Sequence, residues 1–337
     1  MIIGDAFFKN DLSTNHYSYP FLINLPIYIN LPLLIIFLFE IILIMGNHES
    51  LLVLSLFENY INIDIINVKN QITIIDKISL IIIGGLFIGI IGTVPGHELT
   101  HRKKNKFDMF FGNLLLSLSW DCSFALEHVY GHHKNVGLSS DPATAKRNEN
   151  IYLFIIRASL REHYDAWKIE LKHLKRRGYN QFGIYNKMIL GYIRSSIFTF
   201  ISWLIGGVIG MLFYLLCAII AKALLEVINY VEHYGLVRAS NQPVFPRHSW
   251  NANNMISSLL LYNVTRHSAH HEKANLKFWE LKPYPDAPTM PYGYLTMLYI
   301  AFFLPFVFHK IMIKKLIDWD ENYATEEERR IINFEKK

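Results

Sequence analysis

The chain has 337 residues, 52% of them apolar, and a formal net charge of +5 with histidine counted as neutral. Globular chains are about 45–50% apolar with glycine included, so this composition excludes an ordinary soluble domain. The apolar residues lie in long runs, which indicates a membrane protein. The Lys and Arg residues gather in short clusters beside those runs, which is typical of cytoplasmic flanks and does not indicate nucleic-acid binding.

Taken in chain order, the apolar runs predict an all-α fold, a polytopic membrane helical bundle formed as one integral membrane domain over residues 1–337. About 20 apolar residues are enough to cross a bilayer as a helix. Four spans are predicted, at about residues 21–45, 78–95, 188–205 and 206–232. The second span runs directly into Pro95, Gly96 and His97, and a basic stretch follows at 102–106.

Two further apolar stretches, 107–126 and 294–313, are predicted to be helices at the membrane interface. The first is short for a span and is interrupted by Asn113, Trp120 and Asp121. The polar segment 134–187, which contains the basic run 172–177, is predicted to be a cytoplasmic helical excursion. The tail from Asp318 is charged and is expected to be amphipathic or disordered.

The order of the spans places four histidine clusters on one side of the membrane. If the second span enters the cytosol at His97, the third returns and the fourth enters the cytosol again, ending at His233. No full span separates the segments 128–133 and 267–271 from that side. We therefore expect a histidine-rich di-metal region on the cytosolic side of a multi-pass inner (plasma) membrane protein.

The spacing within the clusters predicts a metal site. Residues at i and i+4 share one face of a helix, so His97 and His101 are expected to present two imidazoles to one ion. His128 and His132 repeat this spacing with His133 offset, and 267, 270 and 271 are again expected on one face. Imidazole binds iron, copper, zinc and nickel. Nine imidazoles exceed what one ion accepts, so two ions are implied.

Any one of these histidines, taken alone, would be an ordinary core or surface residue, and an isolated HExxH would suggest a zinc protease. The prediction of a metal site rests on the occurrence of all four histidine clusters in one chain. Metal-bound histidines usually pass their second N–H to a carboxylate or carbonyl. Glu98, Glu127 and Glu232 are assigned this role, with direct ligation and structural ion pairs as alternatives, while Asp141 lies further off in the sequence. The remaining histidines are interpreted as structural, and His248 is a candidate for an outer contact: His16, His48, His163, His173, His248 and His309.

Two ions held by nitrogen alone favour redox metal and O₂ over a water-activating zinc site, which needs one ion and three protein ligands. A metal transporter would place His, Asp and Glu inside the spans along a path. Here the histidines lie at span ends and in polar segments, which disfavours that alternative. The affinity of imidazole ligands for divalent metals does not by itself distinguish iron from the other candidate metals.

Together the clusters resemble the membrane di-iron hydroxylase and desaturase superfamily, and in particular its alkane 1-monooxygenase and xylene monooxygenase branch. The motifs that carry the resemblance are HELTHRK (97–103), EHVYGHH with DPAT (127–133, 141–144), NYVEHYGLVR (229–238) and RHSAHH (266–271). The NYVEHYG element, which supplies His233, is absent from desaturases with eight histidines. The segments 278–291 and 318–329 look more like xylene monooxygenases, whereas the middle of the chain looks more like alkane monooxygenases.

The resemblance implies O₂-dependent hydroxylation of a terminal or benzylic methyl C–H bond in a hydrophobic substrate, either a medium-chain alkane or an alkylaromatic compound. It also implies two non-haem Fe ions held by nine residues: His97, His101, His128, His132, His133, His233, His267, His270 and His271. The two cysteines, Cys122 and Cys217, make no rubredoxin or ferredoxin pattern. An external electron carrier, rubredoxin or a ferredoxin-type reductase, is therefore expected.

Two departures from the family pattern bear on these expectations. Ala269 stands where many alkane monooxygenases have Asp, and the DAFF stretch at 5–8, which two further spans usually precede, stands near the start. A shortened form or an incomplete reading frame is one interpretation, and a catalytically dead relative is another. The principal alternative function is a fatty acyl desaturase or hydroxylase, or another lipid-modifying di-iron enzyme.

Overall fold

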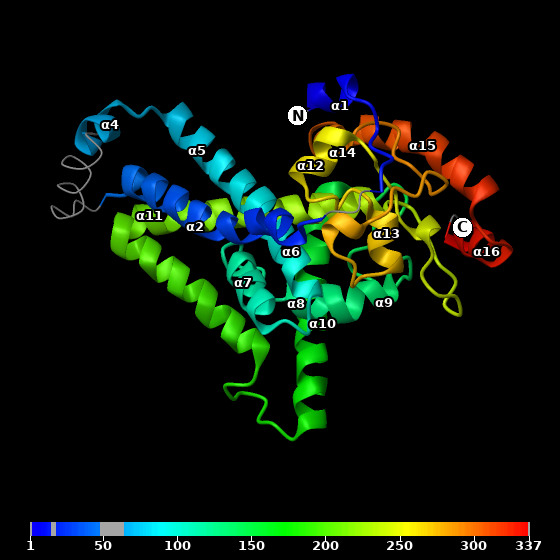
Figure 1. Ribbon diagram of the computed structural model, residues 1–337, viewed down its shortest axis with the longest axis horizontal. Helices are drawn as coiled ribbons and strands as arrows, with labels where there is room; N and C mark the ends of the chain where they lie inside the picture. Colours follow the sequence, from blue (N-terminus) through cyan, green and yellow to red (C-terminus); the bar gives the residue numbers. More distant parts are fainter. Residues whose placement is uncertain (1, 15–17, 48–63, 336–337) are drawn as a thin grey trace.

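A computed structural model describes residues 2–14, 18–47 and 64–335 (Figure 1). In these ranges the regular structure is helical, apart from two isolated β-bridges, Asn10 with Asn254 and Asn251 with Thr289. The all-α membrane bundle predicted from the sequence is confirmed. The helices are α1 (Ile2–Phe7), α2 (Pro20–Met45), α4 (Ile65–Gln71), α5 (Ile74–Phe87), η1 (Ile88–Thr93), α6 (Val94–His101), α7 (Lys106–Ser117), α8 (Phe124–Glu127), η2 (His128–His132), α9 (His133–Asn135), α10 (Ile151–Arg177), α11 (Lys187–His233), η3 (Pro246–His248), α12 (Met255–Leu260), α13 (His267–Glu272), η4 (Phe278–Glu280), α14 (Tyr294–Phe303), α15 (Pro305–Asn322) and α16 (Glu326–Glu335).

Within the described ranges, three continuous helical stretches are long and apolar enough to cross a membrane: Pro20–Met45, Ile74–His101 and Lys187–His233. Less than half of the most apolar part of each is buried inside the protein. Apolar side chains that the fold leaves exposed are expected where lipid is the solvent. In Figure 1 these helices gather on the left, while α12 to α16 lie on the right.

The third stretch is bent rather than straight. Gly207 has φ +63° and ψ −160°, which no helix accommodates, and Figure 1 shows the two arms of α11 diverging from the bend on the left. At the same place Asn47 donates its backbone N–H to the carbonyl of Gly206, and a Cβ on Gly46 would lie 2.2 Å from the Cα of Gly206. Because Gly46 and Gly206 have no side chains, the end of α2 can contact the bend of α11. The arms correspond in position to the predicted third and fourth spans, whose crossing of the membrane stays a prediction.

Two π-helical segments lie in the helices that carry the first histidine clusters. η1 joins α5 to α6, so the helix that begins at Ile74 continues to His101 with one wider turn inside it. η2 begins at His128 and ends at His132. π-Helical turns with i→i+5 hydrogen bonds occur frequently at functional sites because they redirect side chains.

The two predicted interfacial helices are interrupted. In the first, α7 ends at Ser117, a turn with Trp120 at φ +57° follows, and α8 begins only at Phe124. The stretch 294–313 breaks after α14, because Pro305 cannot donate a backbone hydrogen bond and starts the new helix α15. The charged tail is helical over Pro305–Asn322 and Glu326–Glu335, and Arg147 pairs with Asp320 at 2.5 Å.

Candidate metal centre

Nine histidine side chains from four separate segments meet in two groups. The five-histidine group contains His97, His101, His128, His133 and His270, and the four-histidine group contains His132, His233, His267 and His271. In each group the candidate ligand nitrogens lie within 4.8 Å of one another. Rings of the two groups are neighbours, with 4.5 Å between the centroids of His133 and His271. All nine histidines predicted from the sequence are therefore brought together.

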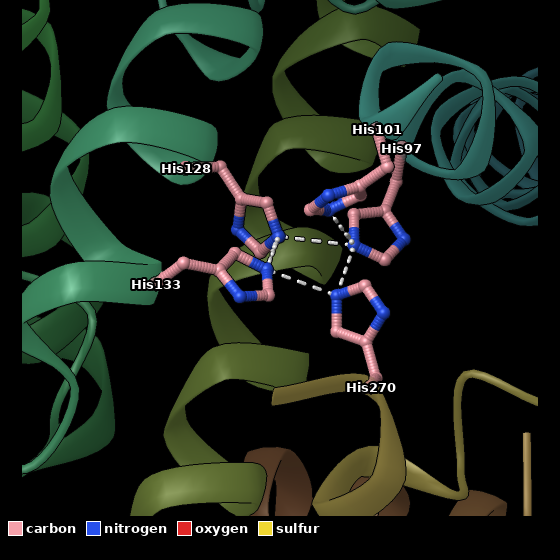
Figure 2. A group of neighbouring side chains, drawn as sticks. All are labelled: His97, His101, His128, His133 and His270. Carbon is pink, nitrogen blue, oxygen red and sulfur yellow. Dashed lines mark hydrogen bonds between the residues drawn. The ribbon is translucent and has the colours of Figure 1, made fainter. Parts of the chain in front are cut away.

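The Nε2 atoms of the five-histidine group surround a common point (Figure 2). Four of them form a closed quadrilateral, with 3.0 Å from His97 to His128, 3.1 Å from His128 to His133, 3.0 Å from His133 to His270 and 3.0 Å from His270 to His97. The Nε2 atom of His101 lies 3.2 Å from that of His97. The centre of a square with ~3.0 Å sides lies about 2.1 Å from each corner, which is a usual metal–imidazole bond length.

The four-histidine group converges in the same way. Its Nε2 atoms are separated by 3.1 Å between His233 and His267, 2.8 Å between His267 and His271, and 3.3 Å between His271 and His132. Nitrogens facing one another at these distances cannot all be satisfied by hydrogen bonds, because each shared proton serves only one pair. A cation in each group would satisfy every lone pair. The donor set therefore fits two metal ions.

The π-helical segment corrects the predicted pairing in the second cluster. The i, i+4 spacing predicted that His128 and His132 would share an ion, but His128 shares its group with His133 and His132 belongs to the other group. In η2 the turn is wider than an α-helical turn, so residues five apart come to the same face. Adjacent residues 132 and 133 thus serve different groups.

The last cluster is divided as well. His267 and His271 lie four residues apart on α13 and share the four-histidine group, as helix geometry requires. His270, expected on the same face, instead reaches the five-histidine group, where its Nε2 atom lies 3.0 Å from that of His97. The short helix α13 therefore lies between the two groups and contributes to both.

Burial keeps the imidazoles of this site neutral. Desolvation, assisted by neighbouring histidines, lowers the pKa of five imidazoles well below the ordinary value of 6.5: His128, His133, His267, His270 and His271. The neutral ring is the form that binds metal. At neutral pH these residues therefore need no deprotonation before they ligate an ion.

Three of the nine rings, those of His132, His233 and His267, have an oxygen atom close to Nδ1. The carboxylate of Asp141 lies 3.0 and 3.1 Å from Nδ1 of His132 and accepts a hydrogen bond from the Thr144 hydroxyl at 2.6 Å. The backbone carbonyl of His248 lies 3.3 Å from Nδ1 of His233. Such contacts fix the tautomer and direct Nε2 toward the centre. The sequence did not single out Asp141, although it belongs to the DPAT motif.

The three carboxylates assigned from the sequence have different surroundings. Glu232 lies 3.1 Å from Nδ1 of His267, and the Tyr294 hydroxyl donates to the same carboxylate. Glu98 forms an ion pair with Arg102 at 2.7 Å. Glu127 is buried next to Gly131, where burial raises the pKa of its carboxyl well above 4.5. Among the described contacts, only Glu232 of these three reaches an imidazole of the site.

The other histidines that the structure describes lie apart from both groups. His163 contacts the Tyr192 hydroxyl, His173 lies beside Glu170, and His309 contacts the Tyr230 hydroxyl. His248 takes part through its carbonyl, while its ring contacts Glu328 at 2.9 Å. His16 and His48 lie outside the described residues.

A helical membrane protein with a buried polyhistidine centre is the class that this fold and site define. A family model described as fatty acid desaturase matches residues 77–301. The chain belongs to this family. Its curated relatives include alkane 1-monooxygenase 2 of Alcanivorax borkumensis, 36% identical over 249 residues, which is 72% of this chain and 65% of that protein.

Two further relatives point to the same branch. Alkane 1-monooxygenase of Acinetobacter baylyi is 35% identical over 256 residues, covering 74% of this chain and 62% of that protein. The xylene/toluene monooxygenase hydroxylase component of Pseudomonas putida is 35% identical over 246 residues, covering 71% and 64%. These matches confirm the resemblance to the alkane and xylene monooxygenase branch. The chain spans less than two thirds of the length of each of these relatives.

Proposed function

We propose that the protein is a membrane monooxygenase that uses O₂ to hydroxylate a methyl C–H bond of a hydrophobic substrate. The observation that carries the proposal is the pair of buried, all-imidazole groups at the ends of apolar helices. The names of the alkane and xylene/toluene monooxygenases that the chain resembles support the reaction class. The substrate is proposed to be a medium-chain alkane or an alkylaromatic compound.

The nine imidazoles would hold two non-haem iron ions, which supply the redox chemistry for O₂ activation when bound. The protein itself orients the imidazole rings and fixes which ring nitrogen carries the proton. Asp141 and Glu232 hold the rings of His132 and His267 from the Nδ1 side, and the His248 carbonyl holds His233. Burial of these groups excludes bulk water, which favours oxidation of an apolar C–H bond over side reactions.

The reacting end of the substrate is proposed to approach the five-histidine group. A small cavity of about 10 Å³ lies beside His97 and His270, and its other walls are Glu98 and four largely apolar side chains: Val94, Tyr262, Val264 and Leu281. Val94 begins the helix that continues from the apolar stretch α5–η1. An oily chain lying among the apolar helices is proposed to approach His97 from this side.

Electrons are proposed to come from a separate rubredoxin or ferredoxin-type carrier. A cavity of about 480 Å³ borders η2 at Gly131, and its cationic side chains suit an acidic partner by charge steering: Lys134, Arg161, Lys168, Lys172 and Arg176. The basic residues that follow α6 support a cytoplasmic position for the metal centre. The protein is accordingly proposed to be a multi-pass inner-membrane protein.

Metal content and product identity test the proposal together. Detergent-purified protein from iron-57-labelled cells is expected to contain about two irons per chain by elemental analysis, in a nitrogen-rich environment by Mössbauer spectroscopy. Turnover with octane or with xylene should give the corresponding alcohol. An alkene formed from an acyl substrate would favour the desaturase alternative instead. Zinc alone, or no stoichiometric metal, would contradict the oxygenase proposal.

The ligand set is tested by His233→Ala, with His173→Ala as the control because His173 lies on α10 outside both groups. The first variant is expected to lose metal and activity, and the second to keep both. If His233→Ala retained both metal and activity, the nine-histidine set would be wrong.

A further inference from the structure

A second cavity with cationic side chains lies at the start of α11, and none of the nine histidines lines it. It has a volume of about 240 Å³ and is bordered by the end of α6, by α7, α8 and η2, and by the first turns of α11. Four cationic side chains line it: Lys103, Lys106, Lys187 and Arg194. Its remaining walls are largely apolar and include Met109, Phe110, Leu126, Val129 and Leu190.

These four cations have no acidic partner within the described ranges, where no carboxylate forms an ion pair with any of them. Arg194 donates only to neutral oxygens, Ser117 Oγ at 3.3 Å and Asn113 Oδ1 at 3.2 Å. Nearby Arg102, in contrast, pairs with Glu98 at 2.7 Å. The cavity therefore concentrates positive charge that the protein does not itself neutralise.

The cavity lies at one end of a candidate membrane span, where lipid head groups are expected. Lys187 is the first residue of this helix, and Arg194, seven residues later, lies about 10 Å further along its axis. A long cationic side chain inside an apolar helix extends its charge toward the polar interface. Lys103 lies over the Tyr130 ring, 4.4 Å from its centroid. Aromatic rings are enriched at the same level of a membrane.

The adjoining surface is apolar on both helices. Phe107 and Phe110 of α7 are exposed, as are Leu190, Ile193 and Ile197 of α11. Acyl chains can lie against these side chains while a charged group occupies the cavity. A basic pocket between membrane helices with apolar flanks is the arrangement that recognises anionic lipid head groups.

We propose that this cavity binds the phosphate group of an anionic phospholipid, with the acyl chains against the exposed apolar face of α11. Arg194 is only partly exposed and lies behind the lysines along the helix, which favours a small phosphate group that enters the cavity over carboxylates on a docked protein. Bound lipid would tie α7 to the first arm of α11. The proposal is independent of the reaction at the histidine groups.

The test is the thermal stability of the detergent-purified, metal-loaded full chain with added lipid. Cardiolipin or phosphatidylglycerol is expected to raise Tm by about 5 °C relative to the same amount of phosphatidylcholine. Inorganic phosphate at the same phosphate concentration is expected to leave Tm unchanged. An equal rise with phosphatidylcholine or with inorganic phosphate would overturn the lipid proposal.

The triple variant Lys103→Gln/Lys106→Gln/Lys187→Gln should lose most of this rise, while Arg194 is kept to preserve its contacts with α7. The control variant Lys134→Gln/Lys168→Gln/Lys172→Gln removes the same charge from the other basic cavity and should respond as the unmodified protein does. If the triple variant fails to purify, Lys187→Gln alone is expected to show a reduced response. A full lipid response combined with weaker carrier-dependent turnover would instead identify a protein-docking site and overturn the proposal.

Discussion

The Nε2 atoms of His128 and His133 lie 3.1 Å apart, although the two residues are five positions apart in the sequence. In an α-helix, His132, four positions after His128, would lie beside His128. Here His132 belongs to the four-histidine group instead. The π-helical segment η2 therefore distributes adjacent histidines between two groups. Its geometry decides how many donors each group receives, five in one and four in the other.

This distribution predicts different effects for substitutions at neighbouring positions. His132→Ala leaves three donors in its group and His133→Ala leaves four in the other, so the first should lose one of two metal ions and the second should largely keep both. Elemental analysis after dialysis against a weak chelator measures the difference. His163→Ala, which removes a ring outside both groups, serves as the control. Equal metal loss in the 132 and 133 variants would contradict the assignment.

Asp141 is predicted to control metal affinity without touching the metal. Asp141→Asn keeps the size of the side chain but removes the charge that holds the Nδ1 proton of His132. Loss of such a contact typically costs 10–100-fold in metal affinity or activity, and we expect a change in that range by chelator competition. Asp165→Asn removes a carboxylate near Arg161 and Lys168 on α10 and should leave affinity unchanged. An unaltered affinity in the Asp141 variant would show that His132 needs no orientation.

Lys222 is predicted to be the most stability-sensitive lysine on α11. Its Nζ lies 3.1 Å from Asp121, 2.9 Å from Glu162 and 2.7 Å from Glu226, and these three carboxylates are buried. Lys222→Met leaves them without a counter-charge, which costs about 3–5 kcal/mol for a buried pair. Thermal unfolding in detergent should show a fall in Tm of several degrees.

The matched control for Lys222 is Lys168→Met. Lys168 faces Asp165 at 3.6 Å on an exposed surface, where ion pairs contribute about 0–1 kcal/mol. Lys222→Arg, which keeps the charge, should recover part of the lost stability. A Tm for Lys222→Met that matches the control would mean that the three carboxylates are protonated and need no cation.

Glu328 is predicted to make stability depend on acid pH. The Phe245 N–H donates to Nδ1 of His248, so Nε2 carries the proton donated to Glu328 at 2.9 Å. Burial opposes ionisation of Glu328, but contacts with His248, the Thr325 segment and Arg247 lower the pKa of its carboxyl to about 2 from 4.5. A lowered folded-state pKa contributes stability that is complete above 4.5 and is lost as pH falls toward 2.

Glu328→Gln should therefore destabilise the protein by about 2 kcal/mol near neutral pH, the usual contribution of a hydrogen bond to a charged group. The difference in Tm between variant and unmodified protein should shrink as pH falls from 4.5 toward 2. Glu327→Gln, an exposed neighbour, controls for the change in net charge. A difference that stays constant across this interval would show that ionisation of Glu328 is not its cause.

The histidine motifs predicted the ligands of the metal centre, and the apolar runs predicted the membrane helices. Both predictions were possible because they depend only on the spacing of residues close together in the sequence. Helical periodicity placed His97 and His101 in one group, and the lengths of the apolar runs placed a boundary between two spans at 205/206, where α11 bends at Gly207. The same reasoning paired His128 with His132, since sequence spacing does not reveal a π-helical turn. The outer contact of Asp141 was missed because a loop, not a helix face, returns it to His132.

The Lys222 cluster could not be predicted for a different reason. Its carboxylates come from the turn before α8, from α10 and from α11, and only Glu226 is a helical neighbour of Lys222. Their meeting depends on how the helices pack. The apolar surface of α2 and α5 was predictable from composition, whereas the contact of the end of α2 with α11 at Gly206 required the tertiary structure.

The distances in sequence between the meeting histidines make each metal group a long-range cross-link. His97 and His270 are 173 residues apart, and His132 and His271 are 139 apart. In chain-entropy terms, closing loops of this length restricts the unfolded chain by about 5 kcal/mol. Removal of metal would therefore release α13 and the C-terminal helices from α6 while the apolar hairpins stay folded in the bilayer. Protease should then cut the chelated protein first between α11 and α14.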